Sequence, residues 1–285
     1  MLLGRNIPVA SLFGAGLTLV RSLPRLAMVK RPLSVLWNYI RKTSPEYVEL
    51  RSGHRVYFSS HPDDIVSFYL VFIKKEYGEV HKGDVVFDIG ANIGCFAVCA
   101  ALSGAKTVHA FEPSREAFSV LLKNIHANKL DSIIVPVNKA VSDRSGEIVR
   151  FPHKASPFNS LVMTAGPESK LHVDRFTGDL REHALAMSAS LEIEFNEIET
   201  VALGDYMSEQ GVPSIDLLKM DCEGAEYSIV PSLSKETIDR IVSIRMECHG
   251  DSKALMDSFC HDAYTVERSS GDELWLLKRH DALSS

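Results

Sequence analysis

The sequence of 285 residues predicts an α/β protein in which one mostly parallel sheet carries helices on both faces. Short apolar runs of strand length alternate with helix-length segments from about residue 84 to residue 260. The first of these runs, residues 85–89, breaks into a glycine turn and leads into an apolar helix. A strand, a tight turn and a helix in this order begin a βαβ unit, which is the building block of parallel sheets.

The individual elements follow from period, capping residues and turn residues. In chain order we expect a helix from Pro32, a hairpin over 47–58, a helix over 65–77, a strand at 84–89, a helix at 92–103, a strand at 107–111, a helix at 114–129, a strand at 132–138, a hairpin of 146–151 with 158–163, a strand at 191–196, a helix at 202–209, strands at 215–220 and 240–246, a helix at 251–260 and strands at 264–267 and 273–278.

We divide the chain into three parts. Residues 1–45 form a basic, partly helical N-terminal extension, residues 46–80 form a hairpin and a helix that pack on the core, and residues 81–285 form the α/β domain. An insert at about 145–190 interrupts this domain. Its second half, residues 164–190, has little period, which is typical of a functional lid or a disordered insert.

Charge is distributed unevenly over the chain. Residues 1–42 hold seven Lys and Arg residues and no acid, and the remainder holds 24 basic against 37 acidic residues. An acidic body argues against a nucleic-acid substrate, because phosphate binding needs a basic surface. The five cysteines show no CxxC motif and no disulfide spacing, so we expect reduced thiols.

The N-terminal extension admits two interpretations. Residues 7–20 are largely apolar but too short to span a bilayer. Leu33, Leu36, Trp37 and Ile40 then follow a helical period that Arg41 and Lys42 close. This helix either packs against the body or makes peripheral contact with a membrane through residues 1–42. We therefore expect a cytoplasmic protein, with membrane association left open.

The glycine turn and the following strand predict a nucleoside site. Asp88, Gly90 and Gly94 lie where a strand meets a helix, and Glu112 ends the next strand, eighteen residues beyond Gly94. An acid there is placed to bind a ribose diol. Asn92 stands where dinucleotide sites have their second glycine. Asp88 would repel a diphosphate and suits a ligand with an ammonium group, which favours S-adenosylmethionine.

Polar residues at the other strand ends are further candidates, because ligands bind beyond the carboxyl ends of parallel strands. Asn138 and Asp143 follow the third strand and could reach an adenine edge or serve only as turn formers. Asp221, Glu223 and Glu226 follow the strand at 215–220; Asp221 is expected to face cofactor or acceptor, and Glu226 is expected to be structural. Glu247 and His249 follow the strand at 240–246 and leave it on one face.

Three separated motifs resemble the FkbM family of S-adenosylmethionine-dependent methyltransferases. They are VFDIGANIG at 86–94, AFEP at 110–113 and IDLLKMDCEGAE at 215–226, and Asn124, Ala140 and the pair Glu247 and His249 match further positions. The resemblance covers about residues 46–280. It implies a Rossmann-like class I methyltransferase fold with a mostly parallel seven-stranded sheet. It also implies methylation of a hydroxyl oxygen on a sugar, lipid or natural product, with Pro113 and Ala140 among the residues that contact the donor.

For the chemistry, the hypothesis is that His249 removes the proton of the acceptor hydroxyl, oriented by Glu247 or Glu223, with Asp221 near the methionyl group or the acceptor. A rival version makes Asp221, Glu223 and His249 ligands of a divalent metal that polarises the acceptor; we do not favour it. The alternative outside the enzymes is a non-catalytic module that binds S-adenosylmethionine and is anchored through its N-terminal helix. The partner is expected to be a small-molecule or lipid-linked hydroxyl compound, and the oligomeric state is unknown.

Overall fold

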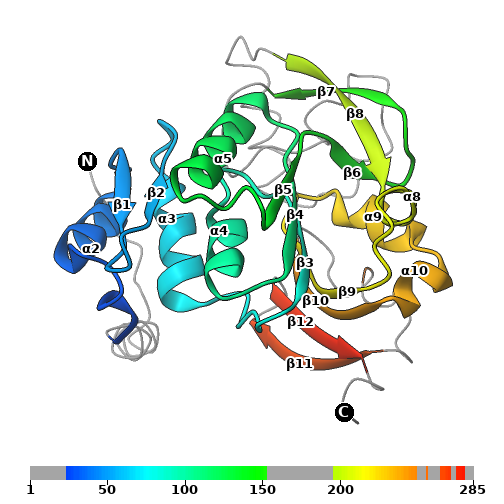
Figure 1. The fold of residues 1–285 in the computed structure, drawn as a ribbon. Helices are drawn as coiled ribbons and strands as arrows, with labels where there is room; N and C mark the ends of the chain where they lie inside the picture. The colour runs from blue at the N-terminus through cyan, green and yellow to red at the C-terminus, as the bar shows by residue number, and fades with distance from the viewer. Residues whose placement is uncertain (1–23, 153–194, 249–254, 256–263, 271–273, 280–285) are drawn as a thin grey trace, which may run out of the picture.

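A seven-stranded sheet organises the protein. The computed structural model describes residues 24–152, 195–248, 255, 264–270 and 274–279. Within these ranges the strands β3 to β5 and β9 to β12 form the sheet in the order β11-β12-β10-β9-β3-β4-β5 (Figure 1). All neighbours are parallel except β12, which is antiparallel to both β10 and β11. The predicted fold class, a mostly parallel Rossmann-like sheet of seven strands, is confirmed.

The strand bounds are close to those that the sequence predicts. They are β3 (Val85–Ile89), β4 (Thr107–Phe111), β5 (Ile134–Val137), β9 (Ile215–Met220), β10 (Ile241–Glu247), β11 (Tyr264–Ser270) and β12 (Leu274–Arg279). From β3 the chain runs first to β4 and β5 on one side and later to β9 and β10 on the other. The strand order therefore reverses between β3 and β9, and the carboxyl ends of these two strands are where such sheets bind ligands.

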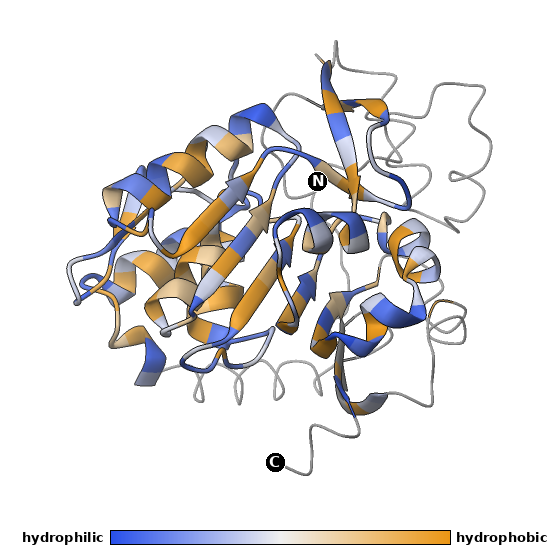
Figure 2. Ribbon diagram, turned by 45° about the vertical axis from the view of Figure 1, so that its right-hand side comes forward, coloured by the Kyte–Doolittle hydropathy of each residue, from blue (hydrophilic) through white to orange (hydrophobic). Residues whose placement is uncertain are grey.

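Helices cover both faces of the sheet (Figure 1). On one side lie α3 (Asp64–Phe68), η1 (Tyr69–Lys74), α4 (Cys95–Leu102) and α5 (Arg115–Ala127), and on the other lie α8 (Leu203–Glu209), α9 (Glu226–Ser232) and α10 (Lys235–Asp239). Successive strand residues point to opposite faces. Val86 and Val108 accordingly join the core under α4 and α5, whereas Phe87 and Phe111 join the core under α8 and α9. Figure 2 shows the strands as largely hydrophobic, as expected for strands that helices cover on both faces. It shows the helices as mixed, as expected for helices that are buried on one side only.

Two elements near the N-terminus precede the central sheet, and a buried asparagine attaches one of them to the core. They are α2 (Pro32–Arg41) and a hairpin of β1 (Tyr47–Glu49) and β2 (Arg55–Tyr57). The fully buried Asn124 of α5 accepts a hydrogen bond from the Tyr57 amide at 2.6 Å and donates to the carbonyls of Tyr57 and Ile93 at 2.9 and 2.8 Å. One side chain therefore joins the hairpin to the turn that precedes α4. Among the described residues, no helix has the length and apolar character needed to cross a membrane.

Residues that follow β5 in the chain form a sheet of three strands, and the prediction for this region was partly wrong. The sheet consists of β6 (Ala140–Ser142), β8 (Phe195–Ala202) and β7 (Ile148–Pro152), in that order. The sequence predicts a strand at 191–196 and a helix from 202, but β8 extends through Ala202 and pairs antiparallel with β7. The predicted pairing of residues 146–151 with 158–163 is not tested, because residues 158–163 are not described. The short elements β6 and α10 were not predicted. Residues 158–163, 164–190 and, apart from Leu255, the predicted helix at 251–260 lie outside the described residues.

Candidate active site

Close contact between the ends of β3 and β9 fixes the glycine turn. Gly90 has a φ of +77°, and a Cβ at this position would lie 2.0 Å from the backbone oxygen of Asp221. Gly94 has a φ of +86°, and its Cβ would lie 2.5 Å from Cδ1 of Leu121. Only glycine fits either position without displacing its neighbour. The turn is thus held against β9 on one side and α5 on the other.

Glu112, at the end of β4, binds this turn through its carboxylate. Its Oε2 accepts a hydrogen bond from the Asn92 amide at 2.7 Å, and its Oε1 accepts one from the Ser114 amide at 2.8 Å. Burial raises the pKa of Glu112 to about 7, against the opposing effect of these two hydrogen bonds. A carboxylate offers about four acceptor positions, so two remain for a ligand after the backbone has taken two.

Asp88, at the end of β3, has a different environment. Its side chain is fully buried, and its Oδ1 lies 3.0 Å from Nζ of Lys219 on β9. The same ammonium donates to the Gly90 carbonyl at 2.8 Å and lies 3.9 Å from Oδ2 of Asp221. Burial alone would lower the pKa of Lys219, but Asp88 and Asp221 outweigh burial and raise it. Lys219 is therefore charged, and Asp88 is its counter-ion.

Two further carboxylates share one tyrosine. The hydroxyl oxygen of Tyr77, which follows η1, lies 2.7 Å from Oδ2 of Asp221 and 3.0 Å from Oε2 of Glu247. The tyrosine side chain is buried, and burial raises its pKa well above the ordinary value, so the phenol keeps its proton. This single proton holds the ends of β9 and β10 together, at the strand ends where the sequence predicts catalytic acids.

The loop after β9 is held by Glu226, as the sequence predicts. Its fully buried carboxylate accepts hydrogen bonds from the amides of Cys222 at 2.8 Å and Gly224 at 2.7 Å. Glu223 between them has a φ of +54°, in the left-handed region that non-glycine residues seldom adopt. The loop conformation therefore depends on Glu226, and it turns Glu223 to the cavity.

These strand ends surround one cavity of about 260 Å³. Eight of the predicted site residues line it: Gly90, Asn92, Glu112, Pro113, Ala140, Asp221, Glu223 and Glu247. Its ionisable lining contains five acids and three lysines, namely Asp63, Glu112, Asp221, Glu223 and Glu247 with Lys42, Lys139 and Lys219. The excess of acids favours a cationic ligand over a diphosphate.

Comparison with protein families identifies the domain that contains this cavity. Residues 88–271 match the model of the methyltransferase FkbM domain. The chain belongs to the FkbM methyltransferase family. The matched segment begins at Asp88, within β3, and contains β9 and both exit loops, so it includes most of the residues that line the cavity. The match is narrower than the resemblance over residues 46–280 that the sequence suggests.

Individual relatives agree with this assignment. The chain is 33% identical to the 31-O-demethyl-FK506 methyltransferase FkbM of Streptomyces tacrolimicus over 183 residues, which cover 62% of this chain and 70% of the relative. It is 27% identical to the hexuronic acid methyltransferase AglP of Haloferax volcanii over 158 residues, covering 55% of this chain and 52% of the relative. A solved FkbM methyltransferase of Methylobacillus flagellatus KT aligns with a TM-score of 0.43 and 12% identity, over 75% of this chain and 48% of that one.

Four of the predicted residues that the structure describes do not line the cavity. Asp88 lies beneath it, so Lys219 rather than Asp88 faces the ligand space, contrary to our expectation of a direct ammonium contact. Gly94 packs on Leu121. Asn138 donates to the Glu112 carbonyl at 2.7 Å and so supports β4. Asp143 is exposed beside Arg144.

His249, the predicted general base, lies outside the described residues. Within the ranges that are described, no cluster of three or more His, Cys, Asp or Glu residues is arranged to hold a metal ion.

Sequence reasoning missed two residues of the site, Tyr77 and Lys219. Lys219 had a detectable signal, because it is a charged residue between the apolar residues Leu218 and Met220 of the strand 215–220, both of which are buried. Buried lysines need a counter-ion. Tyr77 gave no such signal. It lies 144 residues from Asp221 and 170 from Glu247, so only the fold brings the three together.

Proposed function

We propose that this FkbM-family protein is an S-adenosylmethionine-dependent O-methyltransferase that acts on a hydroxyl group of a sugar, a lipid or a natural product. The observation that carries the proposal is Glu112, a buried carboxylate at the tip of β4 that lines the cavity and retains acceptor capacity for a ribose diol. The names of two relatives, which act on 31-O-demethyl-FK506 and on hexuronic acid, support a hydroxyl-bearing acceptor.

The residues present fit the proposed donor. Asn92 lines the cavity, and its buried Oδ1 has no hydrogen-bond partner among the described residues, which leaves an acceptor for a ligand. Glu112 would hold the ribose diol, and the acids of β9 and β10 would face the positive end of the donor. When bound, S-adenosylmethionine supplies a methyl group that its sulfonium already activates.

The protein's part is to hold the acceptor in line and to remove a proton. Transfer of the donor's methyl group to the acceptor oxygen would leave S-adenosylhomocysteine, and Glu112 and Asn92 are the residues that would hold the donor. In-line alignment supplies roughly 7–11 kcal/mol. The hydroxyl proton goes to His249 in this proposal, and the negative charge of Glu247 and Asp221 stabilises the imidazolium that results.

Tyr77 acts in this scheme as a positioning residue. Its phenol donates to the pair of carboxylates and holds them at the cavity wall. Without that hydroxyl two like charges would face each other in a partly buried space, which is unfavourable for both. In this proposal Tyr77 keeps Asp221 and Glu247 in place for the base.

The test is formation of S-adenosylhomocysteine. The purified protein is incubated with methyl-labelled S-adenosylmethionine and a panel of hydroxyl acceptors that includes hexuronic acid glycosides and macrolide alcohols. We expect turnover with at least one hydroxyl compound, persistence of that turnover after exhaustive chelation of metals, and a loss of roughly 10²–10⁴-fold in a His249→Ala variant. A protein that binds the donor but transfers no methyl group to any acceptor would instead be a binding module.

A further inference from the structure

Helix α2 carries an apolar face that the described part of the chain leaves uncovered. Leu33, Trp37 and Ile40 follow a spacing of four and three residues, which places them on one side of a helix, and 79%, 59% and 74% of their surfaces are exposed. The opposite side of α2 is already used, since Val35 is buried and Leu36 and Tyr39 pack on the core. Figure 1 shows α2 at the far left of the molecule, with α3 between it and the sheet.

Basic residues surround this apolar face. Residues 24–42 contain five Lys and Arg residues and no acid: Arg25, Lys30, Arg31, Arg41 and Lys42. The guanidinium of Arg41 lies over the Trp37 ring, 4.7 Å from its centre. The rest of the protein is acidic, with a net charge of −13 from residue 43 onwards. Arg25, Lys30 and Lys42 form ion pairs with Glu79, Glu49 and Asp63. Arg31 and Arg41, at the two ends of α2, have no ion pair with a described residue.

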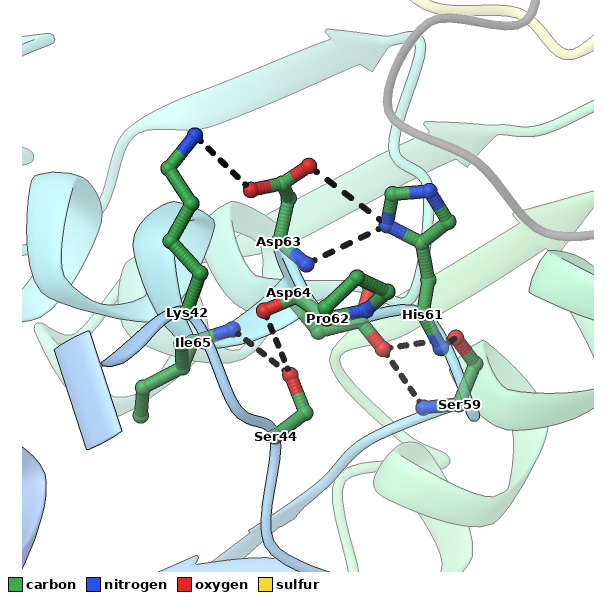
Figure 3. A network of polar contacts seen from close by, with 8 residues as sticks. All are labelled: Lys42, Ser44, Ser59, His61, Pro62, Asp63, Asp64 and Ile65. Atoms are coloured by element: carbon green, nitrogen blue, oxygen red, sulfur yellow. Dashed lines mark hydrogen bonds and ion pairs between the residues drawn. The ribbon is translucent and has the colours of Figure 1, made fainter. Parts of the chain in front are cut away.

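Polar contacts join the end of α2 to the start of α3 (Figure 3). Nζ of Lys42 lies 3.4 Å from Oδ1 of Asp63, and both residues line the cavity. Oγ of Ser44 accepts a hydrogen bond from the Ile65 amide at 3.2 Å and donates one to the Pro62 carbonyl at 3.1 Å. These contacts hold α2 in place relative to α3.

We propose that α2 docks on an anionic lipid surface, with Leu33, Trp37 and Ile40 inserted into the headgroup region and Arg31 and Arg41 against the lipid phosphates. An apolar face with Trp and flanking Arg and Lys residues suits the membrane interface, and the acidic body would be repelled and turned away from it. A second copy of the chain is a poorer occupant. Three side chains on a ten-residue helix offer far less than the roughly 800 Å² per partner that a stable protein interface buries.

The experiment is co-sedimentation of the full chain with vesicles of phosphatidylcholine, with and without phosphatidylserine. We compare the wild type with a triple variant (Leu33→Ser, Trp37→Ser, Ile40→Ser), a charge variant (Arg31→Gln, Arg41→Gln) and a control (Val135→Ser, Ile148→Ser). The control removes apolar side chains that are 38% and 63% exposed elsewhere on the surface. No donor or acceptor is present, so the outcome is independent of the proposed enzymatic function.

We expect the wild type and the control to bind the phosphatidylserine vesicles. The charge variant should bind about thirtyfold more weakly, roughly fivefold for each arginine, and the triple variant should remain in the supernatant. Absence of wild-type binding, or equal binding by the triple variant, would overturn the proposal. A wild-type dimer in light scattering that the triple variant reduces to a monomer would also overturn it, because the face would then belong to a second copy.

Discussion

Asp88 and Glu112 both lie near the carboxyl ends of two neighbouring parallel strands, yet their environments differ. Both side chains are almost completely buried. Asp88 faces the ammonium of Lys219 at 3.0 Å, whereas Glu112 is held by two backbone amides. Burial raises the pKa of both side chains, but a buried carboxylate with a cationic partner has its charged form favoured by that partner, as Lys219 does for Asp88. One with only amide partners titrates near neutral pH, as the pKa of about 7 for Glu112 indicates.

The difference assigns separate tasks to residues that look alike in the sequence. Asp88 neutralises Lys219 and so stabilises the junction of β3 and β9, on which the position of the glycine turn depends. Glu112 lines the cavity and keeps two acceptor positions. The comparison therefore predicts that loss of Asp88 affects folding first, whereas loss of Glu112 affects donor binding first.

The largest expected effect is that of Asp88→Asn on stability. This substitution leaves the buried Lys219 without its main counter-ion, so we expect a loss of about 3–5 kcal/mol in the free energy of unfolding, measured by urea denaturation. Combining it with Lys219→Met should restore part of the loss, since both charges are then removed. Lys235→Met breaks an ion pair on the surface and should change stability far less, because exposed ion pairs contribute little. Equal effects of the buried and surface changes would contradict the structural role of Asp88.

The next effect is that of Glu112→Gln on donor affinity. The substitution removes the charge that would accept the ribose hydroxyls, and two hydrogen bonds to a charged group are worth about 3 kcal/mol or more. We expect the dissociation constant for S-adenosylmethionine to rise at least about hundredfold in calorimetry. Circular dichroism should stay that of the wild type. A variant that binds the donor as tightly as the wild type would show that Glu112 has no part in recognition.

A smaller effect is expected for Tyr77→Phe. Loss of the phenol removes the hydrogen bonds that hold Asp221 and Glu247 at the cavity wall, so the reacting end of the site should lose its fixed geometry. At neutral pH we expect kcat to fall roughly tenfold while the KM for the donor hardly changes, which is equivalent to about 1.4 kcal/mol. Tyr206→Phe is the matched control, because it removes another buried hydroxyl, one that contacts His109 on the opposite face of the sheet. A purely structural role would make the two variants alike, with no selective fall in kcat for Tyr77→Phe.

The smallest effect concerns pH. Because burial raises the pKa of Glu112 to about 7, the ionised fraction should rise about threefold between pH 6.5 and 7.5, and donor affinity should rise with it. The effect on stability has the opposite sign, because the folded state binds the proton of Glu112 more tightly than the unfolded chain does. The contribution of Glu112 to the free energy of unfolding is therefore fully present below about pH 4.5 and is lost as pH rises through 7. Calorimetry at both pH values checks the binding, and Glu112→Gln should remove the dependence. A pH dependence that persists in this variant would assign it to another group.

The sequence predicted the central sheet well because local signals coincide there. Residues 85–89, 107–111 and 215–220 are apolar runs of strand length that end at turn residues or acids, and each is a strand in the structure. The positions that required glycine were visible for the same reason. Period and turn residues act over a few positions, so they suffice for elements of this kind.

Contacts between distant segments could not be predicted in the same way. The pairing of β7 with β8 joins residues that 42 intervening positions separate, and β6 is too short to give a period. At the site, the acids were predicted as a group, but the sequence does not say which of them has a cationic partner. Asp88 was expected in the cavity because its partner, Lys219, lies 131 residues away and was not considered.

The most direct test of the central claim, that the cavity beside Glu112 binds an adenosyl donor, is a calorimetric titration of the wild-type protein with S-adenosylhomocysteine and, separately, with NAD. The account predicts saturable binding of S-adenosylhomocysteine at one site per chain and no measurable heat with NAD, since a diphosphate would meet an excess of acids. Tighter binding of NAD than of S-adenosylhomocysteine would contradict it.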